Sequence, residues 1–583
     1  MIHRLIDATA FLAKAWKLAS PYWYSEERWR ARGLLAAILV LTLGSVYLSV
    51  LFNYWNREWF NALQEKNYAD FSALLLYFCF LAAIFVSTAV YKIYLRQALE
   101  MRWRAWLTKQ YVGAWLGKQV YYRLELSNRG TDNPDQRIAE DLRLFTNGTL
   151  ALGLDLITSV VTLVSFVIIL WNVSGPLSFT VGGIEVAIPG YMVWAAVIYA
   201  IAASVLTHYV GRSLIGINFQ KERLEADFRF SMVRLRENAE GVALYKGEAP
   251  ERTGLLGRFE RVRANWWELM RLTKRLTYFT AGYAQAAVVF PFVVAAPRFF
   301  SGTLTLGGLT QIADAFGQVQ DALSWFVSNY AGIASWKASV DRLLTFKQAL
   351  AQASADAEKS EGIQVQPEPG EALRAENLDL ALPGVDGKAG RLIVAGASLD
   401  IQPGSRVLLT GPSGSGKSTL FRALAGIWPF GKGLVRVPAG ARFLFLPQKP
   451  YIPIASLRDA VCFPAASNAF SDEEIREALR ACKLDAFAER LDELQNWSMS
   501  MSSGEQQRLA IARALLNKPD WLFLDEATAS LDEPTEALIY GTIRERLPRT
   551  TLVSIAHRPA VAAFHQTRYA LEVSGERMRL VSA

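Results

Sequence analysis

Long apolar stretches dominate the first 349 residues, whereas the last third of the chain alternates short apolar runs with polar turns. Each long stretch has enough residues to cross about 30 Å of hydrocarbon as a helix. The fifth and sixth stretches contain Gly and Gln, and the sixth also contains Asp, so they are less hydrophobic than the others. The pattern predicts a membrane α-helical domain followed by a soluble α/β domain, with membrane spans at 33–53, 71–95, 150–172, 190–211, 277–300 and 305–331.

The same pattern divides the chain into four parts. Residues 33–349 are predicted to form a six-helix membrane domain with two long polar loops, and a linker at 350–370 leads to a soluble domain at 371–583. Residues 1–32 are rich in aromatic and basic side chains but lack the long apolar core of a secretory signal. Such a segment either lies on the membrane surface or packs against the helical bundle, and both interpretations stay open.

Some membrane helices are expected to continue far beyond the bilayer. No proline interrupts the chain from Tyr191 to Lys246, and helical periodicity persists there. Asn133, Pro134 and Gln136 have the spacing of an N-cap, a first helical residue and a capping-box partner. A helix from there to Asn172 would be ~57 Å long, about twice the hydrocarbon thickness. The sequence therefore predicts long cytoplasmic helix extensions.

The positions of the basic residues explain the formal net charge of +8. These residues are concentrated before the first span, between 96 and 143, and between 212 and 275, and they are sparse in the intervening loops. By the positive-inside rule, both termini of this multi-pass protein are cytoplasmic. No nucleic-acid partner is needed to explain the charge. The three cysteines match no metal-binding spacing.

One glycine-rich segment carries the strongest chemical signal. It follows an apolar run at 407–410 and precedes a helical pattern. A strand, loop and helix in this order form a P-loop, in which backbone N–H groups and a helix N-terminus surround phosphate oxygens. Lys417 can reach the β- and γ-phosphates of a nucleotide, and Ser418 can bind Mg²⁺. The predicted phosphate-binding residues are Gly411, Pro412, Ser413, Gly414, Ser415, Gly416, Lys417, Ser418 and Thr419.

Further motifs in a fixed order argue against a chance glycine-rich turn. Asp525 and Glu526 end an apolar strand, where they suit Mg²⁺ binding and polarisation of an attacking water. Ser502 and Gly504 precede a helix that also contains Glu505, and they form a second candidate anion site at its N-terminus. Two more polar residues, Gln448 and His557, each follow an apolar strand.

This ordered set resembles the ATP-binding cassette (ABC) ATPases over residues 371–583. Taken alone, a histidine after a strand could also be a core residue, but the resemblance implies that His557 contacts the γ-phosphate. It also implies that Gln448 senses Mg²⁺ and that Asp532 belongs to the D-loop. ATP and Mg²⁺ are the implied cofactors. The implied catalytic residues are Glu526, His557 and Gln448. The residues implied to bind Mg²⁺, partly through water, are Ser418, Gln448 and Asp525. The resemblance further implies that the nucleotide is bound by the P-loop together with Ser502, Gly504, Glu505 and Asp532.

Two positions depart from the family pattern. Ser503 stands in the signature motif where the family usually has Gly, a change that the flanking Ser502 and Gly504 should tolerate. Leu382, just before Pro383, replaces the aromatic residue that usually stacks on adenine. Because base stacking contributes ~1–3 kcal/mol, we expect weaker nucleotide binding and looser selectivity for adenine.

The membrane half carries a second resemblance. The segments 21–29, 131–141 and 236–247 resemble the SbmA/BacA-type membrane domain, whose fused transporters are bacterial relatives of the ABC subfamily D half-transporters. The resemblance implies an exporter-type ABC fold in a bacterial cytoplasmic (inner) membrane, with membrane lipid around it. It also implies cobalamin or peptides, including antimicrobial and bleomycin-like peptides, as cargo. One chain supplies half of the usual ABC complement, which favours a homodimer.

A polar stripe in the sixth span suggests where cargo would pass. Gln311, Asp314, Gln318 and Asp321 recur at spacings of three, four and three, so they share one helix face. Acidic groups are costly in lipid, so this face either lines an acidic, water-filled cavity or pairs with neighbouring helices. A wet cavity would suit cationic peptides.

The sequence therefore predicts an ATP-driven transporter of bulky hydrophilic solutes, taking up peptides or cobalamin. The alternative within the family is an acyl-CoA or lipid exporter, which the acidic stripe disfavours. A non-transporting ABC ATPase conflicts with six charge-flanked spans. An ATP-gated channel would differ from a transporter in lacking turnover that scales with substrate.

Overall fold

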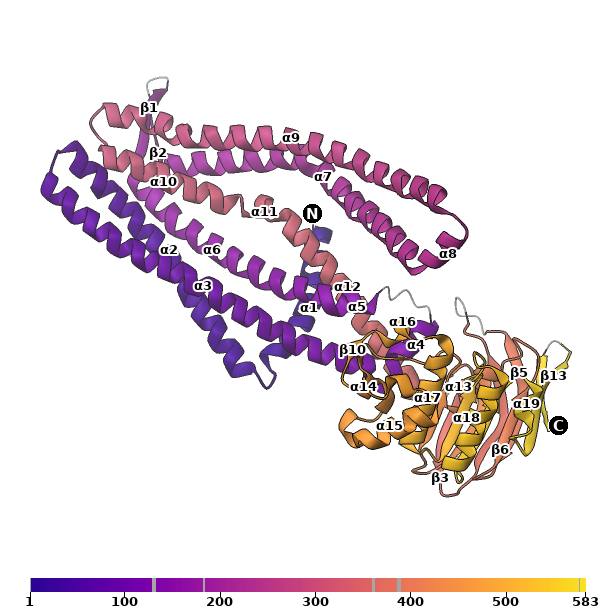
Figure 1. The fold of residues 1–583 in the computed structure, drawn as a ribbon. Coiled ribbons are helices and arrows are strands. Elements are labelled where there is room, and N and C mark those ends of the chain that lie inside the picture. Colours follow the sequence, from indigo (N-terminus) through magenta and orange to yellow (C-terminus); the bar gives the residue numbers. More distant parts are fainter. Residues whose placement is uncertain are drawn as a thin grey trace. The chain divides into compact units, whose positions relative to one another are not determined.

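The computed structural model describes residues 2–127, 133–181, 184–358, 362–384, 390–575 and 577–582. The chain separates into two compact units, which we describe one at a time (Figure 1). The helical unit comprises Met1–Ala114 and Thr131–Gln348, and the sheet unit comprises Trp115–Gly130 and Ala349–Ala583.

The helical unit consists mainly of long helices joined by short turns. A π-helical turn at Arg137–Asp141 leads into the third long helix. The elements are α1 (Ile2–Trp23), α2 (Arg28–Gln64), α3 (Tyr68–Leu116), α5 (Pro134–Gln136), α6 (Leu142–Ser174), the hairpin β1 (Pro176–Val181) and β2 (Ile184–Pro189), α7 (Tyr191–Glu237), α8 (Ala239–Leu244), α9 (Glu248–Phe300), α10 (Leu306–Leu323), α11 (Trp325–Ser328) and α12 (Tyr330–Glu358).

The predicted helix extensions are confirmed. Helix α7 has 47 residues and α9 has 53, so each is roughly 70–80 Å long, more than twice the hydrocarbon thickness. The two helices run side by side (Figure 1). In the described part of the chain, four helical stretches are long and apolar enough to span a membrane, beginning at Arg28, Tyr68, Pro134 and Glu248. The number six therefore stays a prediction for α7 and α10.

The sixth predicted span is not one continuous helix. Helix α10 ends at Leu323, a short helix α11 follows, and α12 begins at Tyr330. Ser324 and Asn329 lie at the two breaks, and the Asn329 Nδ2 donates to the carbonyl of Trp325 at 3.1 Å. Such local side-chain hydrogen bonds compete with the backbone ladder of a helix, which explains the break at Asn329.

The predicted capping box at Asn133 is also wrong. Asn133 has φ 50° and ψ 72°, whereas an N-cap needs an extended backbone, and its side chain makes no capping bond. The Gln136 Nε2 instead donates to Glu140 Oε2 at 3.2 Å. The rest of the predicted helix forms, because Pro134–Ser174 is one helical stretch with a π-helical turn inside it. Thr131 and Asp132 lie outside the described residues.

Helix α10 lies at the centre of the helical unit and contacts α2, α6, α7 and α9. Its Ile312, Phe316 and Val319 are fully buried. The N-terminus of α10 approaches α2 so closely that a Cβ on Gly307 would lie 2.0 Å from the Arg57 carbonyl oxygen. Only glycine fits at this position, and it fixes the depth at which the two helices pack.

The sheet unit contains a ten-stranded sheet in the order β3-β7-β4-β5-β14-β13-β6-β12-β11-β8. Strands β6, β12, β11 and β8 are mutually parallel, and their buried residues form near-continuous apolar runs. The strands are β3 (Ile363–Glu368), β4 (Leu373–Ala381), β5 (Leu392–Ile401), β6 (Arg406–Thr410), β7 (Gly431–Pro438), β8 (Phe443–Leu446), β11 (Trp521–Asp525), β12 (Thr551–Ile555), β13 (Thr567–Ser574) and β14 (Arg577–Ser582). The longer helices are α13 (Lys417–Leu424), α15 (Asp472–Ala481), α17 (Ser503–Asn517) and α18 (Glu533–Arg546), and the shorter elements are α14 (Leu457–Cys462), α16 (Trp497–Ser500), α19 (Pro559–Ala562), β9 (Ala455–Ser456) and β10 (Leu494–Gln495).

The structure corrects two predicted boundaries. The linker at 350–370 is largely ordered, because its first residues continue α12 and Ile363–Glu368 forms β3, which pairs in parallel with β7. Residues 350–358 are rich in Ala and other helix formers, which explains the helix. In addition, helix α4 (Val120–Ser127) belongs to the sheet unit, where Leu126 packs against its apolar core.

Candidate nucleotide-binding and hydrolysis site

The predicted P-loop joins β6 to α13. Gly411, Gly414 and Gly416 all have positive φ values, of 147°, 75° and 94°. Glycine adopts these conformations without strain, which allows the tight turns that a phosphate-binding loop requires. A Cβ on Gly416 would also lie 3.1 Å from Val394 Cγ2, so a larger residue would disturb the first turn of α13.

Lys417 is the first residue of α13, and its ammonium group points back into the P-loop. The Nζ donates to the carbonyl oxygens of Gly411 at 2.9 Å and Pro412 at 2.8 Å. Only 5% of Lys417 is exposed. This burial lowers the pKa of Lys417, while the nearby carboxylates of Glu526 and Asp525 act in the opposite direction. The charge is therefore held beside the position that phosphate oxygens would take.

Ser418 and Asp525 lie in direct contact. The Ser418 Oγ donates to Asp525 Oδ1 at 3.0 Å. Burial raises the pKa of Asp525, and the bond from Ser418 partly offsets the rise. A hydroxyl oxygen and a carboxylate next to a phosphate-binding loop are the ligands that Mg²⁺ prefers. The residues present therefore fit a Mg²⁺ ion bound together with nucleotide phosphates.

Glu526 lies between the two other predicted catalytic residues. Its Oε2 accepts a hydrogen bond from Gln448 Nε2 at 3.0 Å, and its Oε1 lies 3.1 Å from His557 Nε2. Glu526 also has a positive φ of 49°, which is unusual for a non-glycine residue and marks a strained position. The structure therefore brings Gln448, Glu526 and His557 together around one carboxylate.

The sheet topology explains why residues so far apart in sequence meet. Asp525 is the last residue of β11, and the P-loop, His557 and Gln448 follow strands β6, β12 and β8, respectively. These four strands are neighbours and parallel, so their carboxyl ends lie at one edge of the sheet. Ligands of open α/β sheets bind at this edge.

The signature segment forms a regular helix cap. Ser502 is the N-cap of α17, and its Oγ accepts from the Glu505 backbone N at 3.3 Å. The Glu505 Oε2 in turn accepts from the Ser502 N at 2.8 Å. Ser503 occupies the first helical position without strain, as the sequence suggested. The carboxylate of Glu505 is thus engaged in the cap, and Asp532 similarly caps α18 through Thr535 N at 2.8 Å.

Gln507 is a site residue that the sequence analysis missed. It is 2% exposed, and its Nε2 donates to the Gln448 carbonyl at 3.0 Å. Its Oε1 accepts from the Ser530 backbone N at 2.9 Å. One side-chain amide therefore ties the segment at Gln448 to the D-loop. The sequence offers a signal, since a second Gln beside Gln506 on an otherwise apolar helix face needs buried polar partners.

The residues of the polar stripe of α10 differ in burial, and some of them bind a neighbouring helix. Gln311 is fully buried, and its Nε2 donates to Asn53 Oδ1 on α2 at 3.0 Å. The Asn53 Nδ2 donates to Asp314 Oδ2 at 2.5 Å. Gln318 is half-buried and Asp321 is exposed. Gln311 is therefore a helix-packing residue in this structure, which corrects its assignment to a cavity wall, and Asp314 is bound to an amide of a neighbouring helix.

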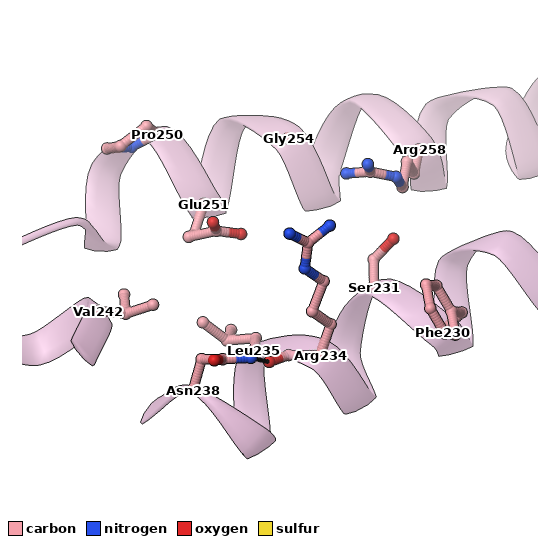
Figure 2. Close-up of a pocket in the computed structure, with 10 residues that line it drawn as sticks. All are labelled: Phe230, Ser231, Arg234, Leu235, Asn238, Val242, Pro250, Glu251, Gly254 and Arg258. Carbon is pink, nitrogen blue, oxygen red and sulfur yellow. Dashed lines mark hydrogen bonds between the residues drawn. The ribbon is translucent and has the colours of Figure 1, made fainter. Parts of the chain in front are cut away.

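The turn between α7 and α9 forms a polar groove of about 520 Å³. Figure 2 shows Arg234 of α7 and Arg258 and Glu251 of α9 facing this groove. Leu244 and Tyr245, at the end of α8, are 76% and 89% exposed. Large apolar side chains at such exposure are typical of surfaces that another protein segment covers.

Comparisons with known proteins decide the family. Residues 18–300 match the family model "ABC transporter transmembrane region 2", and residues 394–529 match the model "ABC transporter". The inner membrane ABC transporter ATP-binding protein YddA of Escherichia coli is 35% identical over 563 residues, which cover 96% of this chain and 98% of that protein. The chain belongs to the ABC transporters. Its activity is therefore ATP hydrolysis coupled to transport, and the chain binds ATP.

Other relatives place the transporter with the subfamily D type. The chloroplastic ABC transporter D family member 2 of Arabidopsis thaliana is 33% identical, over 95% of this chain and 85% of that protein. The lysosomal cobalamin transporter ABCD4 of mouse is 28% identical, over 87% of this chain and 86% of that protein. The fold resembles a bacterial Atm1-family ABC exporter solved with ATP bound, with a TM-score of 0.66, 20% identity and 94% of each chain covered. The predicted exporter-type fold is confirmed.

Proposed function

We propose that two copies of this transporter form a homodimer that uses ATP and Mg²⁺ to take up bulky hydrophilic solutes. Peptides and cobalamin are the proposed cargo, and a bacterial cytoplasmic membrane with both termini in the cytoplasm is the proposed location. The observation that carries the proposal is the contact of Glu526 with Gln448 and His557 beside the P-loop. Every chain therefore supplies the same set of hydrolytic residues, so two identical chains would give two equivalent sites.

Hydrolysis at this centre depends on the orientation of one carboxylate. Glu526 polarises the attacking water, while Gln448 and His557 each contact one of its two oxygens and so fix the orientation of the carboxylate. Lys417 and the helix N-terminus of α13 stabilise negative charge that develops on the transferred phosphoryl group. Ser418 and Asp525 would hold Mg²⁺, which neutralises phosphate charge when bound.

The homodimer follows from the incomplete site in one chain. In this family a nucleotide is enclosed by the P-loop of one subunit and the signature serine of the other. Here Ser502 lies at the N-terminus of α17, where it caps the helix through the Glu505 backbone N. Two identical chains would build two equivalent closed sites.

The cargo proposal rests on carboxylates in the membrane helices. Asp321 of α10 is exposed, and so is Asp155 of α6, which the sequence analysis did not single out. Helices α6 and α10 are in contact. Exposed carboxylates on apolar helices are stable only beside water or a cation, so we place them at a wet acidic cavity that suits cationic peptides. Similarity to a cobalamin transporter supports cobalamin as the second cargo class.

Uptake into oriented vesicles tests the proposal. Radiolabelled cobalamin, bleomycin and an acyl-CoA are offered to right-side-out and inverted vesicles, with Glu526→Gln as the inactive control. We expect ATP-dependent movement of cobalamin or peptide toward the cytoplasmic side, and a greater loss of peptide than of cobalamin transport in Asp321→Asn. Movement of acyl-CoA alone, or transport that persists in Glu526→Gln, would contradict the proposal.

A further inference from the structure

The aromatic segment that precedes the first span packs against the helical unit and leaves a groove beside it. Helix α1 contacts α2, so this segment packs against the helical bundle. A groove of about 440 Å³ lies between α1, α2, α3, α6 and α12. This volume is typical of a small-molecule site. Apolar side chains line it almost entirely, among them Leu12, Trp16, Phe145, Leu150 and Trp336.

Stacked aromatic rings make the floor of this groove rigid. Trp103 is fully buried, stacks on Tyr22 with ring centroids 5.8 Å apart, and meets Phe145 edge-on at 5.4 Å. Trp336 is held by a hydrogen bond from its Nε1 to Thr149 Oγ1 at 2.9 Å. A Cβ on Gly148 would lie 2.8 Å from Trp336 Cδ1, so glycine is needed for the ring to lie there. The groove is therefore preformed.

A single basic side chain lies among the groove residues. The Arg32 Nε donates to the Trp23 carbonyl at 3.1 Å, and its guanidinium lies 5.2 Å from the centre of the Tyr24 ring. The two terminal nitrogens of Arg32 have no partner among the described residues. A guanidinium fixed through Nε leaves a planar pair of donors that matches two phosphate oxygens.

The groove lies at the predicted start of the first membrane span. Arg32 directly precedes the first apolar span at 33–53, and Trp16, Tyr24 and Trp29 are exposed nearby. Exposed Trp and Tyr at such a boundary are typical of the membrane interface. An apolar groove at this level would be filled by hydrocarbon rather than water. We propose that it binds one acyl chain of an anionic membrane phospholipid, whose phosphate is held by Arg32.

Lipid titration of the detergent-purified, full-length transporter tests this proposal. Native mass spectrometry counts bound phosphatidylglycerol and phosphatidylcholine with identical chains. We expect phosphatidylglycerol to bind about fivefold more tightly, as expected for one arginine near an anionic lipid. Arg32→Gln should remove this preference, whereas Arg30→Gln, an exposed residue of α2 outside the groove, should keep it. Equal binding of the two lipids to the unaltered chain would overturn the proposal.

A variant that fills the groove tests the acyl-chain site separately from the charge of Arg32. Ala15 lines the groove and is 5% exposed, so Ala15→Phe should displace both lipids without changing the charge. Unchanged lipid binding in a monodisperse Ala15→Phe protein would overturn the proposal. If Ala15→Phe does not fold, quenching of tryptophan fluorescence by phosphatidylglycerol with brominated chains replaces it. Trp16→Phe should then lose more of the quenching than Trp29→Phe, and equal losses would overturn the proposal. Neither assay requires ATP, so failure here is distinguishable from failure of the proposed transport.

Discussion

Spaced polar residues predict both the hydrolysis site and the polar stripe of α10, but the two sets of residues are arranged differently in the structure. In the sheet unit, Gln448, Glu526 and His557 meet because each follows a strand of one parallel sheet. In the helical unit, Gln311 is fully buried and binds Asn53 of another helix. Strand order therefore determines which residues meet. Helix periodicity predicts only that residues share a face, and does not predict which residues of other helices contact that face.

The largest expected effect comes from removing the catalytic carboxylate. Glu526→Gln should lower ATP turnover by about 10²–10⁴-fold, because the water loses its base while the phosphate-binding loop stays intact. Nucleotide binding should persist, as measured by equilibrium titration of the purified protein. Glu572→Gln, an exposed carboxylate on β13, is the matched control and should keep normal turnover. Near-normal hydrolysis in Glu526→Gln would show that Glu526 is not the base, although it meets Gln448 and His557 at the ends of the strands.

A buried ion pair in the helical unit gives the next largest effect, on stability. Asp141 is 1% exposed and binds Arg342 Nε at 2.9 Å and Arg137 Nη1 at 2.8 Å. Asp141→Asn should destabilise the helical unit by roughly 2 kcal/mol, less than for a fully buried pair because the Arg342 side chain is 39% exposed. Thermal unfolding in detergent measures the loss. Asp135→Asn, at an exposed residue of the same segment, should change the unfolding temperature little. Equal shifts for the two variants would mean that the ion pair of Asp141 does not stabilise the helical unit.

These regions also show how far sequence reasoning extends. The ATPase motifs could be placed on strands and helices because each motif lies where an apolar run ends, and the sheet then brings them together. The break at Ser324 and the missing cap at Asn133 reflect local backbone geometry that periodicity does not describe, and the burial of Gln311 depends on Asn53, which is distant in sequence. Gln507 was missed for the same reason, since both its partners are backbone groups of other loops.

The bridge formed by Gln507 should matter more for rate than for nucleotide binding. Gln507→Ala should lower turnover by about tenfold, because two backbone groups lose their partner and the loops at Gln448 and Ser530 move independently. Gln507→Glu keeps the acceptor for the Ser530 N–H but loses the donor to Gln448, so an intermediate rate is expected. Steady-state ATPase kinetics separate kcat from KM. A change confined to KM would assign Gln507 to nucleotide binding instead.

The smallest expected effect concerns base recognition. Leu382 is 39% exposed and offers no aromatic face to adenine. We expect GTP to support turnover within about an order of magnitude of ATP, given the ~1–3 kcal/mol that stacking supplies. Leu382→Tyr should tighten ATP binding several-fold, measured by competition titration. Strict dependence on ATP in the unaltered chain would mean that another side chain stacks on the base.

Subunit mixing tests most directly the claim that two identical chains share their ATP sites. Unaltered chains are co-expressed with chains that carry both Lys417→Ala and Ser502→Arg, so that each composite site of a mixed dimer has one damaged half. ATP turnover of an equal mixture should fall to about a quarter of the unaltered value, because only dimers of two intact chains remain active. Turnover of about half, in proportion to the intact chains, would mean that each chain hydrolyses ATP alone and would contradict the shared-site account.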